Sequence, residues 1–154
     1  MVDNNDVIAV LNDLLETSKD GEEGFRSSAE NADDARLKDF FMRRSKEVRD
    51  GVRELQSLVI SLGGEPVTST SIGGTLHRRW MDIKTALAIN DNTAVLNETE
   101  RAEKVAMEAY QDALEIDLPR AIKEVVMRQL EGVKRNYHLV KELRHIYEAE
   151  AAIH

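Results

Sequence analysis

The chain of 154 residues has no cysteine, only two prolines, few aromatic side chains and no long apolar run. The absence of cysteine excludes disulfide bonds and thiolate metal ligands. No apolar run approaches the roughly 20 residues that a transmembrane helix needs, and no signal-peptide pattern opens the chain. We therefore expect a cytoplasmic protein without a membrane partner.

An excess of basic charge is also lacking, because 29 acidic side chains outnumber 21 basic ones and the net charge is -8. Binding to nucleic acid depends on concentrated Lys and Arg, and the N-terminal segment MVDNNDV contains neither. These features predict no nucleic-acid partner and argue against a DNA-protecting role. The hydrophobic fraction of 42% is enough for a folded core.

The apolar residues recur at helical spacing, and the alternation typical of strands is almost absent. The pattern therefore predicts an all-α protein with four long helices and one short helix. The first long helix runs from about Asn4 to Asn31, and the second follows an N-cap at Asp33 and stops at Gly63-Gly64. The other helices are expected from about Leu76 to Leu87, from the Asn90-Asp91-Asn92 turn to Leu114, and from Pro119 to Tyr147.

The connections between the long helices differ in length. The connection between the first and second long helices is tight, and so is the one between the third and fourth. Each tight connection makes the two helices that it joins antiparallel neighbours. The middle connection, from about Gly63 to Asn92, is long and contains the short helix. Such a connection can carry the chain back along the bundle, so that the second and third long helices run parallel. We expect this ferritin-like topology, rather than simple up-down-up-down order, in a single domain over residues 1–154.

Four polar residues fall on apolar helix faces when successive residues are placed about 100° apart. They are Glu22, Arg44, Glu103 and Gln129, and each lies near the middle of its helix. A buried carboxylate is costly unless it pairs, protonates or binds a cation. We therefore expect a structural polar layer in which Arg44 neutralises Glu22 or Glu103. In this layer Gln129 completes the hydrogen bonds.

A metal site is the alternative interpretation of the same faces. Glu47 and Glu100 lie at their flanks, so the candidate ligands for iron or manganese are Glu22, Glu47, Glu100 and Glu103. Hard cations take several carboxylate oxygens from facing helices. An arginine within the cluster favours the structural interpretation, because its guanidinium supplies the positive charge that a metal would supply.

The short helix carries an apolar stripe of Leu76, Trp80, Ile83 and Leu87. An amphipathic helix needs a surface to cover, and either the bundle or a second copy of the chain would provide one. We predict that this stripe is a self-association surface in a homodimer or other homo-oligomer.

Several segments together resemble a known family. They are LNDLLETSKDGEEGF, LKDFFMRRSKEVRDGVRELQ, LGGEP, LHRRWMDIKTAL, NETERAEKVAMEAY and DLPRAIKEVVMRQ. In order and spacing they resemble a bacterial ferritin-like four-helix-bundle family of unknown function, over nearly the whole chain. The resemblance implies this fold and a bacterial cytoplasmic setting, with a stress association suggested for some relatives. It implies no established reaction.

Di-iron members of the wider ferritin-like group place a Glu on each of two helices and Glu-x-x-His on each of the other two. Glu22 matches the first-helix Glu, and Glu103 or Glu100 matches the third-helix Glu. No His stands three residues after Glu47 or Gln129, so both histidine ligands are missing. We therefore predict a non-enzymatic bundle of unknown specific role. The alternative is a metal-binding redox or storage bundle with an all-carboxylate site.

Overall fold

The computed structural model describes residues 2–69 and 74–153, which contain five helices and no strand. The helices are α1 Asn4–Asn31, α2 Ala35–Ser61, α3 Thr75–Ala88, α4 Asn92–Ala113 and α5 Arg120–Ile153. The all-α prediction is confirmed, with helix bounds close to those expected. No helix in the described part of the chain combines the length and apolarity that crossing a membrane requires.

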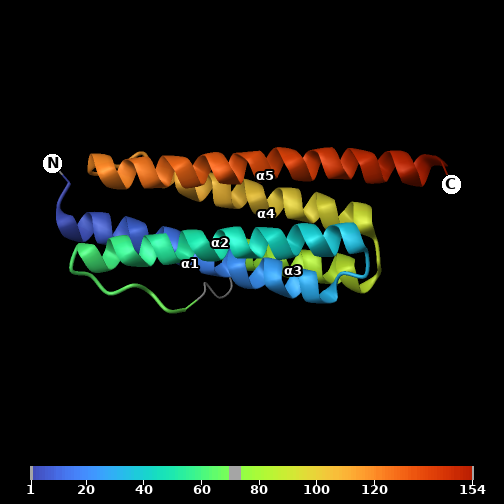
Figure 1. Ribbon diagram of the computed structural model, residues 1–154, viewed down its shortest axis with the longest axis horizontal. Coiled ribbons are helices and arrows are strands. Elements are labelled where there is room, and N and C mark those ends of the chain that lie inside the picture. Colours follow the sequence, from blue (N-terminus) through green and yellow to red (C-terminus); the bar gives the residue numbers. More distant parts are fainter. Residues whose placement is uncertain (1, 70–73, 154) are drawn as a thin grey trace.

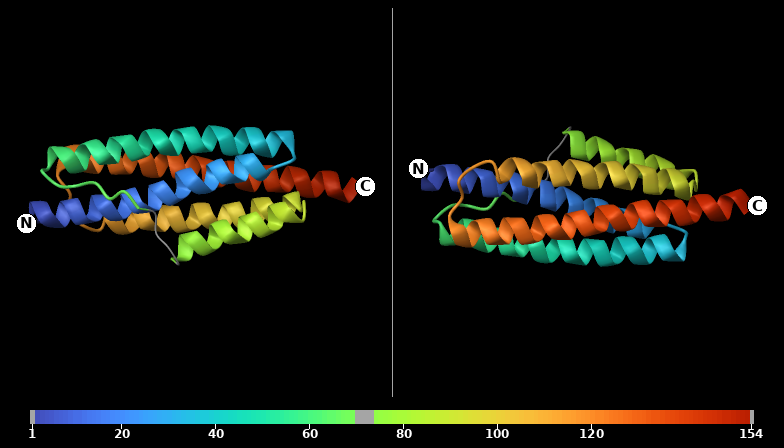
Figure 2. Two further views of the ribbon diagram at one scale, coloured as in Figure 1. Left: turned by 90° about the horizontal axis from the view of Figure 1, so that it is seen from below. Right: turned by 90° about the horizontal axis from the view of Figure 1, so that it is seen from above.

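The four long helices form a bundle of two antiparallel pairs, α1 with α2 and α4 with α5 (Figure 1). The loop after α2 leads back along the bundle, so α2 and α4 run in the same direction (Figure 1). The expected ferritin-like topology is therefore present. The short helix α3 lies outside the four-helix core against α1 and α4, and the end of α5 extends beyond the other helices (Figure 2).

The apolar core has two halves. One half joins α1, α2 and α5 through residues such as Leu11, Leu55 and Val126, together with the C-terminal part of α4. The other half contains Phe41 of α2 and Leu96 of α4, together with most of the buried face of α3. Polar side chains gather between these two halves, and this level of the bundle holds the candidate site.

Aspartate side chains cap the N-termini of three helices: Asp3 for α1, Asp34 for α2 and Asp91 for α4. The prediction that Asp33 caps the second helix is wrong by one residue. Asp34 Oδ1 accepts hydrogen bonds from the backbone N–H groups of Arg36 at 2.9 Å and Leu37 at 3.1 Å. Both groups lie in the first helical turn, where backbone N–H groups lack an intrahelical acceptor and a side chain at the N-cap supplies one.

Asp34 also ties the end of α5 to the start of α2. The Tyr147 hydroxyl donates to Asp34 Oδ1 at 2.7 Å, and Arg36 forms a bidentate ion pair with Glu150 at 2.8 Å. Burial alone would raise the pKa of Asp34. The hydrogen bonds from Tyr147 and from the backbone of Leu37 and Arg36, with the charge of Arg36, lower that pKa overall.

We expect Asp34→Ala to lower the free energy of unfolding by about 2 kcal/mol, since it removes both a helix cap and the hydrogen bond from Tyr147. Urea unfolding at pH 7 measures this change, and Asp33→Ala is the matched control with an expected change below about 0.5 kcal/mol. The folded-state pKa of Asp34 is lowered, so its stabilisation is present above its ordinary value of 3.8 and is lost as pH falls through the folded value. Equal losses in the two variants would contradict the assignment of Asp34 as the cap.

The apolar stripe of α3 is covered within the same chain. Leu76, Ile83 and Leu87 are buried, and they belong to the core half that includes α1 and α4. The prediction that Leu76, Trp80, Ile83 and Leu87 form a self-association surface is therefore wrong. The crossover places α3 against α1 and α4, so the chain's own bundle buries Leu76, Ile83 and Leu87.

The indole ring of Trp80 in α3 packs on α1 at Gly24. Its ring meets the ring of Phe25 edge to face, with 4.7 Å between centroids. A Cβ atom at Gly24 would lie only 2.1 Å from the indole. The close approach of α3 to α1 at this point therefore requires glycine at position 24.

Candidate functional site

A cavity of about 510 Å³ lies between the two halves of the core, and all five helices contribute to its wall. α2 packs mainly on α1 and α5 mainly on α4, and the cavity opens at the seam between α2 and α5. Exposed Glu47, Asp50 and Arg135 stand at this opening. The rest of the wall includes small or apolar residues, namely Gly21, Val48, Gly51, Ala106, Gly132 and Val133. The volume is in the range of small-molecule sites in proteins.

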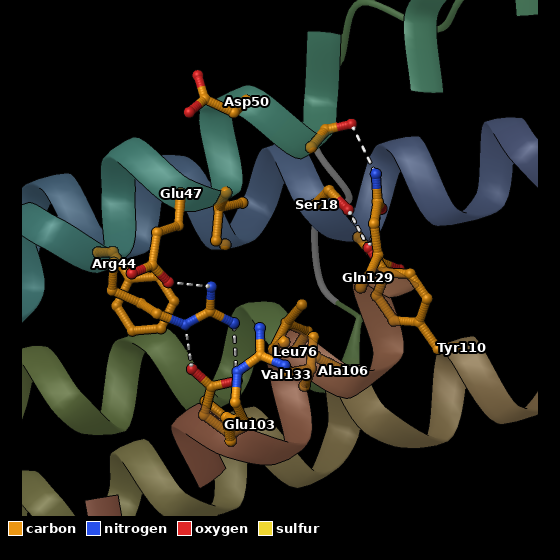
Figure 3. A pocket seen from close by; sticks show the side chains of 18 of the residues that line it. Ser18, Arg44, Glu47, Asp50, Leu76, Glu103, Ala106, Tyr110, Gln129 and Val133 are labelled. Carbon is orange, nitrogen blue, oxygen red and sulfur yellow. Dashed lines mark hydrogen bonds and ion pairs between the residues drawn. The ribbon is translucent and has the colours of Figure 1, made fainter. Parts of the chain in front are cut away.

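An ion pair between Arg44 of α2 and Glu103 of α4 forms one polar part of the wall (Figure 3). Arg44 Nε donates to Glu103 Oε1 at 3.0 Å, and Arg44 Nη2 donates to Glu103 Oε2 at 3.2 Å. Arg44 is 6% exposed and Glu103 is 2% exposed. Since α1 packs against both α2 and α4, this bidentate pair spans the interior diagonally between two helices that are not close neighbours.

The Arg44 guanidinium keeps its positive charge inside the bundle. Burial would lower the pKa of Arg44, but the charge and hydrogen bonds of Glu103, with the charge of Glu47, raise that pKa overall. Glu47 Oε2 lies 3.6 Å from Arg44 Nη1, at the solvent side of the cavity. The guanidinium also lies over the ring of Phe25, with Cζ 5.2 Å from its centroid.

A hydrogen-bond network around Tyr110 of α4 forms the second polar part of the wall (Figure 3). The Tyr110 hydroxyl donates to Gln129 Oε1 at 2.7 Å, which leaves the Ser18 hydroxyl as donor to Tyr110 at 3.3 Å. Gln129 Nε2 donates to Glu54 Oε1 at 2.9 Å, and Glu54 pairs with Arg128. Burial raises the pKa of Tyr110, so its hydroxyl stays protonated and remains a donor at neutral pH.

The network joins four helices, because Ser18 belongs to α1, Glu54 to α2, Tyr110 to α4 and Gln129 to α5. Together with the Arg44–Glu103 pair it satisfies these side chains with partners from other helices. Such contacts hold the register of the helices.

The predicted polar layer is only partly assembled. Arg44 pairs with Glu103, which was one of its two expected partners. Gln129 bonds to Tyr110 and Glu54 instead of completing the ion pair, so that part of the prediction is wrong. Glu22 is half-buried, and among the described residues no ion pair joins its side chain to Arg44. Ser18 and Gly21, not Glu22, face the cavity from this part of α1.

The four candidate metal ligands are not brought together. Glu103 is bound by Arg44, whereas the Glu47 side chain is 57% exposed. Glu100 accepts from Arg144 Nε at 3.0 Å at a separate place on α4. Within residues 2–69 and 74–153, no group of three or more His, Asp or Glu side chains is placed to hold a metal ion. The residues at mid-bundle therefore do not fit a di-iron site.

Sequence reasoning missed the Tyr110 network and the cavity. It gave no role to Ser18 or Glu54. The available signal was small residues on inward faces, Gly21 of α1, Gly51 of α2 and Gly132 of α5, at the level of the polar side chains. Small residues on facing helices leave space between them, and here that space is the cavity.

The number and order of the helices define a ferritin-like four-helix bundle. The family described as "Domain of unknown function (DUF2383)" matches residues 6–116, so the chain belongs to this family. The predicted family resemblance is thereby confirmed. No curated protein matches the chain.

A solved structure supports the fold. The chain is similar to the bacterioferritin-related protein from Bacteroides fragilis, described as a dodecameric thioferritin in the bacterial domain. The TM-score is 0.73 at 15% sequence identity, over 98% of this chain and 92% of the other. At this identity the likeness establishes the common fold.

Proposed function

We propose that the protein is a non-enzymatic ferritin-like bundle in which the Arg44–Glu103 ion pair takes the place of a di-iron site. The observation that carries this proposal is the buried bidentate contact of the guanidinium with both oxygens of Glu103. We also infer that residues 1–154 act as one domain, because both core halves draw on helices from the two ends of the chain.

Electrostatics supports a structural role over metal binding. A cation at Glu103 would have to displace Arg44, and the freed guanidinium would stay buried beside a second positive charge. The remaining candidate carboxylates offer little compensation, because Glu47 faces solvent and Glu100 is paired with Arg144. An all-carboxylate iron or manganese site would therefore require rearrangement of several helices.

Anaerobic titration with Fe(II) and with Mn(II), followed by exposure to air, tests the proposal. We expect no stoichiometric uptake and no new absorbance, because the four glutamates do not share a site. Glu103→Gln is the comparison variant. Stoichiometric binding by the natural chain that disappears in Glu103→Gln would contradict the proposal and support the metal-binding alternative.

We further infer that the chain forms a homo-oligomer, in line with the dodecamer described for the structural neighbour. The α3 stripe is covered, so association has to use another surface. α5 carries exposed Leu139, Ile146 and Ile153 at a spacing of seven residues, which places them on one face. Light scattering should give a multiple of 17.4 kDa, and a clean monomer would contradict this inference.

A further inference from the structure

A second cavity, outside the bundle interior, is a groove of about 320 Å³ between α1 and α2. Its positive side chains are Arg26 of α1 with Lys38, Lys46 and Arg49 of α2. Glu30 is its one acidic lining residue, and Met42, which is 47% exposed, adds an apolar part to the wall. The groove therefore concentrates positive charge on a protein whose net charge is -8.

The four cations meet only one acidic side chain, Glu30, among the residues that line the groove. Across the described residues, no ion pair involves the side chain of Arg26, Lys38, Lys46 or Arg49. Four like charges in one groove repel one another, so a bound anion would gain free energy from all of them.

The spacing along α2 gives the groove a length. Lys38 and Arg49 are eleven residues apart, which corresponds to about 16 Å along the helix axis. Lys38, Met42 and Arg49 follow one another at intervals of four and seven residues, so they share a face of α2. Arg26 lines the groove from α1. The positive charges thus form a line over the length of a small molecule, not a single point.

We propose that this groove binds a small soluble molecule that carries two or more linked phosphate groups. Arginine guanidinium groups bind phosphate oxygens bidentately, and lysine ammonium groups act as mobile point charges. Four cations against Glu30 balance a ligand with about three negative charges, and Met42 meets its less polar part. A long polyanion fits less well, because it would extend from the groove onto a surface of net negative charge.

Isothermal titration of the full-length chain with sodium tripolyphosphate at low ionic strength tests this proposal, with sodium phosphate as the single-phosphate comparison. We expect one-to-one binding that is tighter for tripolyphosphate and weakens as salt is added. Lys46→Glu and Arg49→Glu should each weaken binding by about tenfold or more. Lys104→Glu is the matched control, because Lys104 is also an exposed lysine within a helix but lies on α4, away from the groove. It should change the affinity by less than about threefold.

Circular dichroism of each variant confirms that the helices are intact, so that a loss of binding reports on the groove. The proposal would be overturned by the absence of binding at millimolar tripolyphosphate. It would also be overturned by equal weakening in Lys46→Glu and Lys104→Glu, since that indicates a response to net charge only. Tighter binding to a single-stranded oligonucleotide or to phosphatidylglycerol vesicles would reassign the groove to a macromolecule or a lipid surface. The result is independent of the metal titrations, because no candidate metal ligand lines the groove.

Discussion

Replacing Glu103 with alanine is expected to lower the free energy of unfolding by about 3–5 kcal/mol. The substitution leaves the Arg44 guanidinium, which is only 6% exposed, without the carboxylate that binds two of its nitrogens. The nearest remaining carboxylate is that of Glu47, 3.6 Å from Nη1 and largely in solvent. Leaving a buried charge without its partner lowers the stability of the protein by far more than the intact pair contributes.

Urea unfolding at pH 7 measures this loss, and two further variants separate its causes. Glu108→Ala removes an exposed carboxylate from the same helix and should change stability by less than about 0.5 kcal/mol. The double variant Arg44→Met with Glu103→Leu removes both charges and should recover most of the loss, because neither partner stays buried alone. A loss below about 1 kcal/mol in Glu103→Ala would show that the guanidinium finds water or another carboxylate, against the proposed structural role.

The second large effect is expected at the contact of α3 with α1, where Gly24→Ala should cost about 3 kcal/mol. The new Cβ would lie 2.1–2.6 Å from three atoms of the Trp80 ring. The ring is rigid and is held at its edge by Phe25, so the indole or the whole of α3 has to move. This cost outweighs the gain of up to about 1 kcal/mol that alanine normally brings to a helix interior.

Gly21→Ala provides the matched control, one turn earlier in α1. Its Cβ would lie 3.6 Å from Val48 Cγ1, an ordinary contact, and the variant should be equal in stability or gain up to about 1 kcal/mol. Trp80 is the only tryptophan, so its fluorescence reports directly on displacement of the ring. In a Trp80→Ala background, Gly24→Ala should cause no further loss. An unchanged emission spectrum together with full stability in Gly24→Ala would contradict the close packing of Trp80 on Gly24.

Local features of the sequence were sufficient for the helices and for much of the topology. Apolar spacing of three and four residues predicts each helix, and Asp33 and the Asn90-Asp91-Asn92 turn predict where two of them begin. The long connection between the second and third long helices allows their parallel order. These properties depend on residues close together in the chain, and for this reason the single error among the caps, Asp33 for Asp34, is only one residue.

The partner of each inward polar group depended on the tertiary structure. Placement around a helix shows that Arg44, Glu103 and Gln129 face inward, but it does not set their relative heights or the reach of each side chain. The structure joins Arg44 with Glu103 and directs Gln129 to Tyr110 and Glu54. Small changes in helix register decide such pairings, because a hydrogen bond requires a donor and an acceptor within about 3 Å.

The sequence by itself therefore determined an all-α bundle, its family and the inward position of Arg44 and Glu103. Only the tertiary structure decided that α3 covers its own bundle, and that a cavity instead of a carboxylate cluster lies at mid-height. The physical reason is that an apolar stripe requires burial without specifying the surface that covers it. Whether facing residues meet or leave a space is likewise set by how closely α2 and α5 pack, which depends on contacts between residues far apart in the chain.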